Sequence, residues 1–469
     1  MKKLAAILIY IAGMAGIATA STPFLNVETG SEEVLTFDLS KTFTGVHHLS
    51  GALPSLSVSY GGGRSMQLPL ASVEGCDIMH PEIPTLSFRL PDYPDATQVW
   101  TKDSYADATL DICGNGFCED LADLSVTVKG RGNSTWHMPK KPIRLKFSKK
   151  TSICGFAKAK SYVLLANFLD DSHARNSVAL WLAGKLDVPY ANTTVPCNVF
   201  FNDNFLGLFL LTEKVGINSG SVDIDEEEGI LFELSTEYDE PYKFRSELNN
   251  LPVMVKDPDF DELFDDDDSV TPEERLAFWQ DDFNAAERTA TEANPFDAFD
   301  LDSFVNYILL YNIVANHELS HPKSSYIFKE KAGEDNLYYF GPAWDFDAAF
   351  NLSVAEGSGF AQASPEIPLS LNPLYHRMAL RPEFKERYAE RFAYYYENVY
   401  PELMDFLSSY ETVVTPSAEL DGRRWPQTVS YGWCSRVPSG DMASAFRDLR
   451  EWLEKRTEFL KERAEKGQL

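Results

Sequence analysis

Positive charge is scarce in this sequence of 469 residues. Lys and Arg together number 42, whereas Asp and Glu number 71, so the formal net charge at pH 7 is −29. Nucleic acids and anionic membranes repel a protein with such a negative charge. The charge therefore excludes non-specific binding to either, and we expect no nucleic-acid partner.

Long apolar runs are also missing, except for one short stretch at the N-terminus. Lys2 and Lys3 precede an apolar stretch over residues 4–17, and small residues follow at 18–20. This stretch is shorter than the ~20 residues that span a bilayer, and its flanks are those of a secretory signal peptide. We therefore expect residues 1–20 to be a signal peptide and the mature chain to have no transmembrane segment. The predicted location is secreted, periplasmic or cell-surface, in a bacterium.

Cysteine is infrequent, and the paired CxxC spacings of a zinc site are absent. An exported chain can form disulfides, and six cysteines allow about fifteen pairings. The best local candidate is a bridge between Cys113 and Cys118, because Gly114-Asn115-Gly116 between them is a turn sequence. The six residues are Cys76, Cys113, Cys118, Cys154, Cys197 and Cys434.

The composition present is that of a folded globular protein, with 44% hydrophobic and 24% charged residues. Residues 21–82 are β-rich, with alternating apolar positions and a Gly-rich turn. Residues 83–214 have the pattern of strands with one helix, which we expect to begin near Ser172 with Asp171 as its N-cap. Residues 271–316 and 382–466 are mainly helical, and one helix is expected to run from about Asp302 and to have Asn316-His317-Glu318 in its last turn. Strands followed by helices predict an α+β fold in two lobes.

Charge is distributed unevenly along the chain. Residues 223–302 hold 27 acidic and 5 basic residues, which we interpret as a solvated, partly flexible insertion. Residues 129–150 hold eight Lys and Arg and no acid. On a strand, Arg144 and Lys146 share one face, opposite three apolar residues, and this pair of cations can bind a phosphate.

Three motifs are spaced along the chain. They are Gly130-Arg131-Gly132-Asn133-Ser134-Thr135-Trp136 with Pro139-Lys140-Lys141-Pro142 after it, then Asp171-Ser172-His173-Ala174-Arg175-Asn176, then Trp344-Asp345-Phe346-Asp347. In this order the motifs resemble those of the CotH kinase family, which are secreted or spore-coat protein kinases with an atypical kinase-like fold. The resemblance covers about residues 83–465, and the order of the motifs makes it specific.

The resemblance implies an atypical two-lobed protein-kinase-like fold with a β-rich N-terminal extension. The extension is residues 21–82, and the β-rich nucleotide-binding lobe is residues 83–214. The mainly helical lobe is residues 215–469, with the acidic insertion at 223–302.

The resemblance also implies ATP with Mg²⁺ or Mn²⁺ as cofactors and a protein hydroxyl as phosphoryl acceptor. Asp345 takes the place of the metal-binding Asp, Glu318 accepts the proton, and Asp347 is a second metal ligand or a local structural acceptor. The residues implied in nucleotide binding are Arg131, Lys141, Arg144, Lys146 and Glu213. For Glu213 a salt bridge with Lys214 is an equal alternative. Arg175 and Asn176 either position a metal-binding carboxylate or only pack.

Two positions depart from the family pattern. Glu318 stands where the family has Asp, and Ser324 with Ser325 stand where it has Asn. A longer side chain displaces the carboxylate, and a displacement of about 1 Å can cost about 100-fold in rate. The alternative is a pseudokinase, a surface-associated binding protein that retains the fold.

Residues 317–321 also form the sequence HExxH of zinc metallopeptidases, which is the second alternative. In such enzymes two His one helical turn apart bind zinc and the Glu is the base. Pro322 biases His321 away from helical geometry, and no third His of an extended motif follows. The motif also falls on the turn where the CotH pattern places its catalytic acid.

Overall fold

The computed structural model describes residues 24–29, 34–38, 43–47, 55–60, 64–69, 73–79, 81–93, 101–260, 270–320, 322–333, 335–347, 349–350, 369–426 and 440–466. The predicted signal peptide, His321 and Cys434 lie outside these residues. The chain divides into two compact units. The described residues of Met1–Asp171, Val195–Thr212 and Ser409–Thr428 form the first, and those of Ser172–Thr194, Glu213–Ser408 and Val429–Leu469 form the second.

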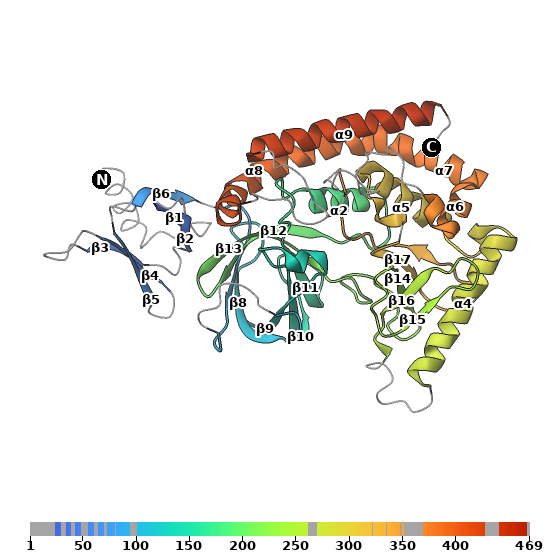
Figure 1. The fold of residues 1–469 in the computed structure, drawn as a ribbon, viewed down its shortest axis with the longest axis horizontal. Helices are drawn as coiled ribbons and strands as arrows, with labels where there is room; N and C mark the ends of the chain where they lie inside the picture. Colours follow the sequence, from blue (N-terminus) through green and yellow to red (C-terminus); the bar gives the residue numbers. More distant parts are fainter. Residues whose placement is uncertain are drawn as a thin grey trace. The chain divides into compact units, whose positions relative to one another are not determined.

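A closed barrel is the centre of the first unit (Figure 1). Its strands are β7 (Thr85–Arg89), β8 (Ala106–Cys113), β9 (Leu121–Gly130), β10 (Ile143–Thr151), β11 (Ala159–Leu165), β12 (Thr194–Phe201) and β13 (Asn204–Glu213). Their order around the barrel is β10-β11-β13-β12-β7-β8-β9, and β12 pairs parallel with β7. Alternate residues of each strand fill the interior, as Ile143 and Leu145 do on β10.

Two small sheets complete the described strands of the first unit. One has the order β2 (Val34–Asp38), β1 (Phe24–Thr29), β6 (Val73–Met79), and the other has β3 (Phe43–His47), β4 (Ser55–Tyr60), β5 (Arg64–Pro69). Phe24 of β1 meets Phe200 of β12 edge-to-face at 5.2 Å between ring centroids, so β1 packs on the barrel. These strands agree with the β-rich pattern, while the domain boundaries at residues 82 and 214 stay predictions.

A buried ion pair fastens the C-terminal part of helix α8 (Tyr400–Arg424) to the barrel. Lys140, with no exposed surface, lies with its Nζ 2.5 Å from Asp421 Oδ1 and also donates to the Leu208 carbonyl. The same Asp421 oxygen accepts the Leu208 N–H at 2.8 Å. Gly207 is required beside this pair, because its φ is +129° and a Cβ there would lie 2.2 Å from Asp421 Oδ1. Lys140 therefore belongs to the interior, although it is part of the basic stretch 129–150.

A five-stranded sheet forms the second unit together with most of the helices (Figure 1). The order is β15 (Lys243–Arg245), β16 (Pro252–Asp257), β14 (Ile230–Leu234), β17 (Ser325–Lys329), β18 (Tyr339–Phe340). Helix α4 (Pro272–Glu292) packs on it through Trp279 and Phe283, which meet Phe232 of β14 edge-to-face. The other long helices are α2 (Arg175–Lys185), α5 (Leu301–Val314), α7 (Pro382–Tyr394) and α9 (Met442–Glu465), with α6 (Pro373–Ala379) and a π-helix (Tyr395–Val399) between.

The described part of the acidic segment 223–302 is folded. It supplies β14, β15, β16 and α4, and several of its acids are paired within the unit. Lys256 bridges Glu233 and Glu240 at 2.8 Å each, and Asp282 pairs with Lys329 at 2.7 Å. This described part differs from the solvated insertion that we expected, because its apolar residues form a sheet and several of its acids pair with lysines of that sheet. The run of acids at 265–268 lies outside the described residues.

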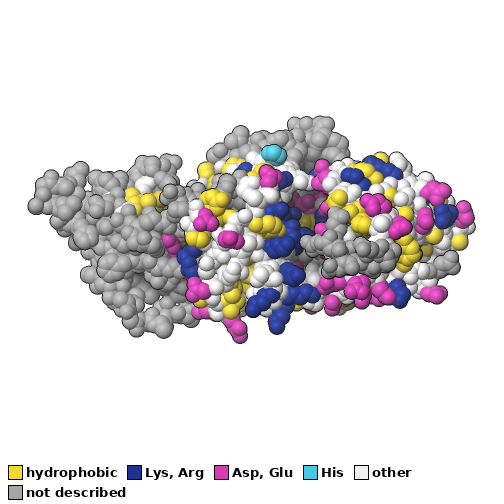
Figure 2. Space-filling view, turned by 90° about the horizontal axis from the view of Figure 1, so that it is seen from below, with side chains coloured by type: hydrophobic (Ala, Val, Ile, Leu, Met, Phe, Trp, Pro, Cys, Tyr) yellow, Lys and Arg dark blue, Asp and Glu magenta, His cyan; other side chains and the backbone are white. Residues whose placement is uncertain are grey.

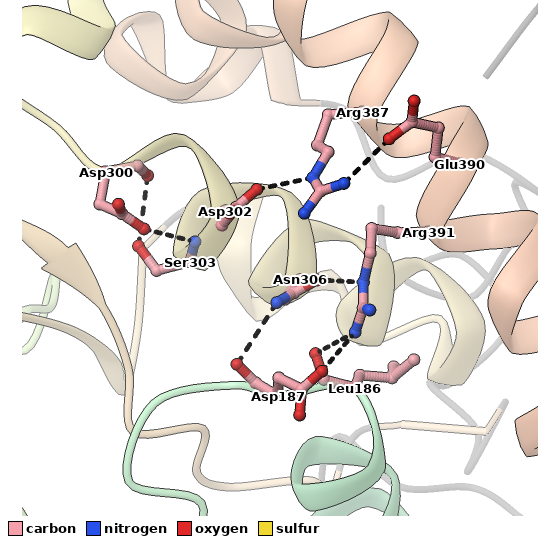
Figure 3. Close-up of polar contacts among 9 residues, drawn as sticks. All are labelled: Leu186, Asp187, Asp300, Asp302, Ser303, Asn306, Arg387, Glu390 and Arg391. Carbon is pink, nitrogen blue, oxygen red and sulfur yellow. Dashed lines mark hydrogen bonds and ion pairs between the residues drawn. The ribbon is translucent and has the colours of Figure 1, made fainter.

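A polar network joins the C-terminal end of α2 to α5 and α7 (Figure 3). Arg391 of α7 donates to the Leu186 carbonyl and to Asp187 Oδ2, each at 2.9 Å, and to Asn306 Oδ1 of α5 at 2.8 Å. Asn306 in turn donates to the Asp187 carbonyl at 3.3 Å. The arginine thereby satisfies the C-terminal end of α2, whose carbonyls have no partner within the helix.

The local sequence predicted the first residue of one helix well and that of another less well. Helix α5 begins at Leu301 with Asp300 as its N-cap, close to the predicted start at about Asp302. The earlier helix was expected from about Ser172 with Asp171 as the cap. Helix α2 instead begins at Arg175, and its N-cap residue Ala174 makes no side-chain cap.

The predicted bridge between Cys113 and Cys118 is wrong. Both residues are thiols, and Cys113 donates to Asn115 Oδ1 at 3.1 Å. Asn115 adopts the left-handed region, with φ of 51°, and donates to the Ile83 carbonyl. The turn is therefore held by the asparagine side chain.

No helix among the described residues is both long and apolar enough to cross a membrane.

Candidate active site

The candidate site lies in the second unit, where helix α5 ends. The helix stops at Val314, and Ala315 caps it in the left-handed region with φ of 50°. Glu318 follows in a 3₁₀ turn, His317–Ser320. The sequence placed Asn316 to Glu318 in the last turn of the helix, so the helix is shorter than expected.

The short turn also bears on the HExxH sequence. Zinc peptidases present both His from one α-helix, with the Glu between them. Here α5 has ended before His317, and the described part of the motif is a single 3₁₀ turn. The structure therefore gives no support to the metallopeptidase alternative.

One buried asparagine sets the position of the two acids of the site. Asn316 donates through Nδ2 to the Asp345 carbonyl at 2.9 Å, and its Oδ1 accepts the Glu318 N–H at 3.0 Å. Its side chain is fully buried, so this bridge is protected from water. The bridge fixes the backbone of the turn that carries Glu318 against the backbone of Asp345.

Strained backbone surrounds Asp345. Its own φ is +63°, and Ser324, whose hydroxyl lies 3.4 Å from Asp345 Oδ2, has φ of +49°. Non-glycine residues with positive φ are uncommon and often occur at functional sites. Of the two serines at the position of the family's asparagine, Ser324 is the one whose side chain faces Asp345, whereas Ser325 donates to the Lys323 carbonyl.

A second asparagine holds Asp347. Asn176 of α2 donates to Asp347 Oδ1 at 2.7 Å, and its Oδ1 accepts the Phe346 N–H at 3.1 Å. Tyr311 of α5 adds a hydrogen bond to the Trp344 carbonyl at 3.3 Å. Of the two alternatives for Asn176, contact with a carboxylate of the Trp-Asp-Phe-Asp motif is therefore the one observed.

Glu318 is held in an unfavourable electrostatic environment. Burial raises the pKa of its carboxyl well above the ordinary value, and the nearby negative charge of Asp345 raises it further. Its Oε2 is buried and has no hydrogen-bond partner among the described residues. Lys323 opposes the shift, and the ion pair of Lys323 with Glu237, 3.0 Å long, raises the pKa of the lysine despite its burial. Sequence reasoning missed Asn316 and Lys323, although Asn316 falls on the family's catalytic turn.

We expect a Glu318→Gln variant to be more stable than the natural protein above neutral pH. Because the pKa of Glu318 is raised on folding, the folded state binds its proton more tightly. The glutamate therefore stabilises fully only below its unfolded pKa, and its contribution is lost as the pH rises through the folded pKa. Urea unfolding at about pH 4, below the unfolded pKa, and at about pH 8 should show a gain of roughly 1–3 kcal/mol at the higher pH only.

The exposed Glu330 is the matched control for this measurement. A Glu330→Gln change should alter the unfolding free energy by less than about 0.5 kcal/mol at either pH, because the side chain is exposed. A Glu318→Gln variant whose unfolding free energy follows that of the natural protein at both pH values would contradict a raised pKa.

The acidic side chains of the site are suitable ligands for a hard cation such as Mg²⁺. Asp345, Asp347 and Glu318 offer carboxylate oxygens, which Mg²⁺ prefers, and Oε2 of Glu318 is available. Within the described ranges, no group of three or more His, Cys, Asp or Glu side chains is arranged to hold a metal ion. Mg²⁺ is usually bound by one or two carboxylates together with water and substrate phosphates, so the site fits a metal that arrives with a nucleotide.

The predicted phosphate-binding cations all lie in the first unit. Arg144 and Lys146 point outward from β10 while its apolar residues point inward, which confirms the predicted alternation. Lys129, opposite Arg144 on β9, joins them around Tyr105, with cation-to-centroid distances of 4.9, 5.9 and 6.0 Å for Lys129, Arg144 and Lys146. Figure 2 shows Lys and Arg side chains gathered in the region of β9 and β10.

The cations around Tyr105 are close enough to affect one another. Burial lowers the pKa of Lys129, and the charge of Arg144 lowers it further. Arg144 Nε is buried and has no hydrogen-bond partner among the described residues. A bound anion would offset the repulsion between Lys129 and Arg144 and would give Arg144 Nε a hydrogen-bond acceptor.

The other two predicted cations, Arg131 and Lys141, lie in the loop between β9 and β10. Lys141 donates to the Trp136 carbonyl at 2.5 Å and lies 5.1 Å from the centre of the Trp136 ring. The Arg131 backbone N–H donates to the Pro142 carbonyl at 3.1 Å. The main chain of the Arg-Gly-Asn-Ser-Thr-Trp motif is thus fixed to the start of β10.

Glu213 belongs to the second unit and is buried. Its Oε2 accepts the Thr193 N–H at 3.2 Å, and Asn192 Nδ2 donates to its backbone carbonyl at 2.9 Å. The carboxylate thereby stabilises the turn before β12. Nucleotide binding by Glu213 stays a prediction.

The family model described as CotH kinase protein matches residues 128–460. The chain belongs to the CotH kinase family. The matched residues include β10, the Asn316 bridge and the Trp-Asp-Phe-Asp motif, and they leave the described strands β1 to β8 outside. No curated protein sequence matches the chain. Membership in the CotH family and a mixed α+β fold are therefore established, and the kinase-like arrangement of the fold stays a prediction.

Proposed function

We propose that this CotH family chain is a protein kinase that transfers the γ-phosphoryl group of ATP to a hydroxyl group of a protein. The observation that carries the proposal is the Asn316 bridge, which holds Glu318 and Asp345 on adjoining backbone segments. Phosphoryl transfer needs a carboxylate for the proton of the attacking hydroxyl and another for the metal that accompanies the phosphates. Both types of group are present in this cluster.

Each acid has a separate role in the proposed reaction. Glu318 accepts the proton of the substrate hydroxyl. The hydroxyl oxygen forms a bond to the γ-phosphorus while the bond between the γ-phosphorus and the β-phosphate oxygen breaks, so that ADP leaves. The raised pKa of Glu318 makes its carboxylate a stronger base than an ordinary glutamate. Asp345 is the proposed ligand of Mg²⁺ or Mn²⁺, which when bound neutralises phosphate charge. Asp347 is a second ligand or fixes the loop through Asn176.

Phosphate binding is proposed for the cations of the first unit. Arg144 and Lys146 share one face of β10, and Arg144 has a buried nitrogen available. Phosphate binding by Arg131 and Lys141 is proposed because these residues match the family motif. Charge-assisted hydrogen bonds from such groups to phosphate are short and about twice as strong as neutral ones.

Binding and transfer should be measured on the same preparation. Titration calorimetry with ATP is expected to show binding that strengthens when Mg²⁺ or Mn²⁺ is added, and γ-labelled ATP is expected to transfer its label to protein. Metal-dependent binding without any label transfer would indicate a pseudokinase and reject the proposed reaction. No metal-dependent binding would reject both the reaction and the nucleotide site.

A further inference from the structure

Four cysteines of the described residues meet at one end of the barrel. Cys113 is the last residue of β8 and pairs with Thr85 at the start of β7, while Thr85 also pairs with Asn198, the neighbour of Cys197 on β12. Cys118 follows the turn after β8, and Cys154 follows β10. Because β8, β9 and β10 run antiparallel in turn, the connection after β8 and the connection after β10 lie at the same end.

Two of these cysteines are in contact. The thiols of Cys118 and Cys154 form a hydrogen bond with each other, and Cys118 packs against the core cluster that contains Cys154. Cys113 is directed elsewhere, to Asn115. Cys197 is fully buried on β12, and its thiol packs in the same core cluster. The described residues contain no group of three or more potential ligands that would make the cluster a metal site.

The two thiols in contact differ in pKa and in burial. The hydrogen bond from Cys154 lowers the pKa of the Cys118 thiol, and Cys118 is only partly buried. The same hydrogen bond, followed by burial, raises the pKa of Cys154. A partly exposed thiol with a lowered pKa beside a buried thiol is the arrangement in which the first attacks a disulfide and the second resolves the product.

We propose that Cys118 and Cys154 form a reversible disulfide that closes a loop around the basic stretch 129–150. The Cys118 thiolate attacks one sulfur of an external disulfide, such as glutathione disulfide or a disulfide of an oxidising protein, and one thiolate leaves. Cys154 then loses its proton and attacks the Cys118 sulfur, and the second thiolate leaves. The chain loses two hydrogens, and the external disulfide becomes two thiols.

The bridge has a consequence for the barrel that does not depend on the proposed kinase activity. The segment between Cys118 and Cys154 contains β9, the loop with Lys141, and β10 with Arg144 and Lys146. Tying its ends together restricts the unfolded chain, which is the main way that disulfides stabilise proteins. Oxidation would therefore stabilise the outward-facing cations of β9 and β10 in their observed positions.

Peptide mapping of the full chain tests the proposal. Purified protein is reduced, the reductant is removed, and the protein is incubated with glutathione disulfide, alkylated under denaturing conditions and digested without reductant. Mass spectrometry is expected to find the Cys118 and Cys154 peptides linked in the natural protein and equally in a Cys113→Ser variant. In a Cys118→Ser variant, Cys154 is expected to be alkylated.

Three results would overturn the proposal. Alkylation of both Cys118 and Cys154 after incubation with the oxidant would show that the contact does not become a bond. A link from Cys118 to Cys113, Cys76 or Cys434 would show that another pairing is favoured. Retention of glutathione on Cys118 without a link to Cys154 would show that the buried thiol does not resolve the mixed disulfide.

Discussion

An Asp421→Asn variant is expected to lose about 3–5 kcal/mol of unfolding free energy. Asp421 is the partner of Lys140, whose side chain has no exposed surface, and it also accepts the Leu208 N–H. Without the carboxylate, the lysine charge would be buried against neutral groups, and such a charge costs far more than an ion pair contributes. The expected loss is therefore among the largest for any single substitution in this chain.

Denaturant unfolding of the variant measures this loss. Asp405→Asn is the matched control, because Asp405 lies on the same helix but is exposed, and it should change the unfolding free energy by less than about 0.5 kcal/mol. Adding Lys140→Met to Asp421→Asn should recover most of the stability, since the buried charge is then removed altogether. A double variant no more stable than Asp421→Asn alone would show that the loss does not come from the unpaired lysine.

An Asp345→Asn variant is expected to lose about 1000-fold in the rate of label transfer from ATP, if the proposed reaction is correct. The amide has nearly the shape of the carboxylate but no negative charge for a divalent metal. Its backbone carbonyl still accepts from Asn316, so the fold of the loop should remain. The loss should therefore appear in transfer and in metal dependence, and the unfolding free energy should stay nearly unchanged.

The exposed Asp335 provides the matched control for Asp345. It lies before β18, ten residues ahead of Asp345 in the sequence, and Asp335→Asn should transfer label at the natural rate. An Asp345→Asn variant that keeps more than about a tenth of the natural rate would exclude Asp345 as the essential metal ligand. Circular dichroism of both variants separates this result from a failure to fold.

Local patterns in the sequence predicted the elements that depend on local physics. The alternation around Arg144 predicted a strand with its cations outward, and the periodic apolar residues after Asp300 predicted helix α5. The motif order predicted the CotH family. Each of these signals is contained within a few residues or in a fixed order of short segments.

The expectations that differed from the structure depended on contacts between distant residues. The end of α5 is determined by Ala315 in a left-handed conformation and by the bond from Asn316 to the Asp345 carbonyl, 29 residues further on. In the described part of the acidic segment, apolar residues form a sheet and several acids pair with distant lysines, as Asp282 does with Lys329. A sequence pattern does not reveal which distant partner a polar side chain will find, so these features could be recognised only in three dimensions.

The Lys140–Asp421 pair also has a consequence for the order in which the protein can be made. The two residues are separated by 281 positions, so at about 5–20 residues per second roughly 15–55 s of synthesis pass between them. During that time every strand of the barrel has been made, but Lys140, which is buried in the folded protein, does not yet have its carboxylate partner. The barrel can therefore complete its native packing only near the end of synthesis, and chain fragments that stop before residue 421 are expected to be trapped by chaperones or degraded.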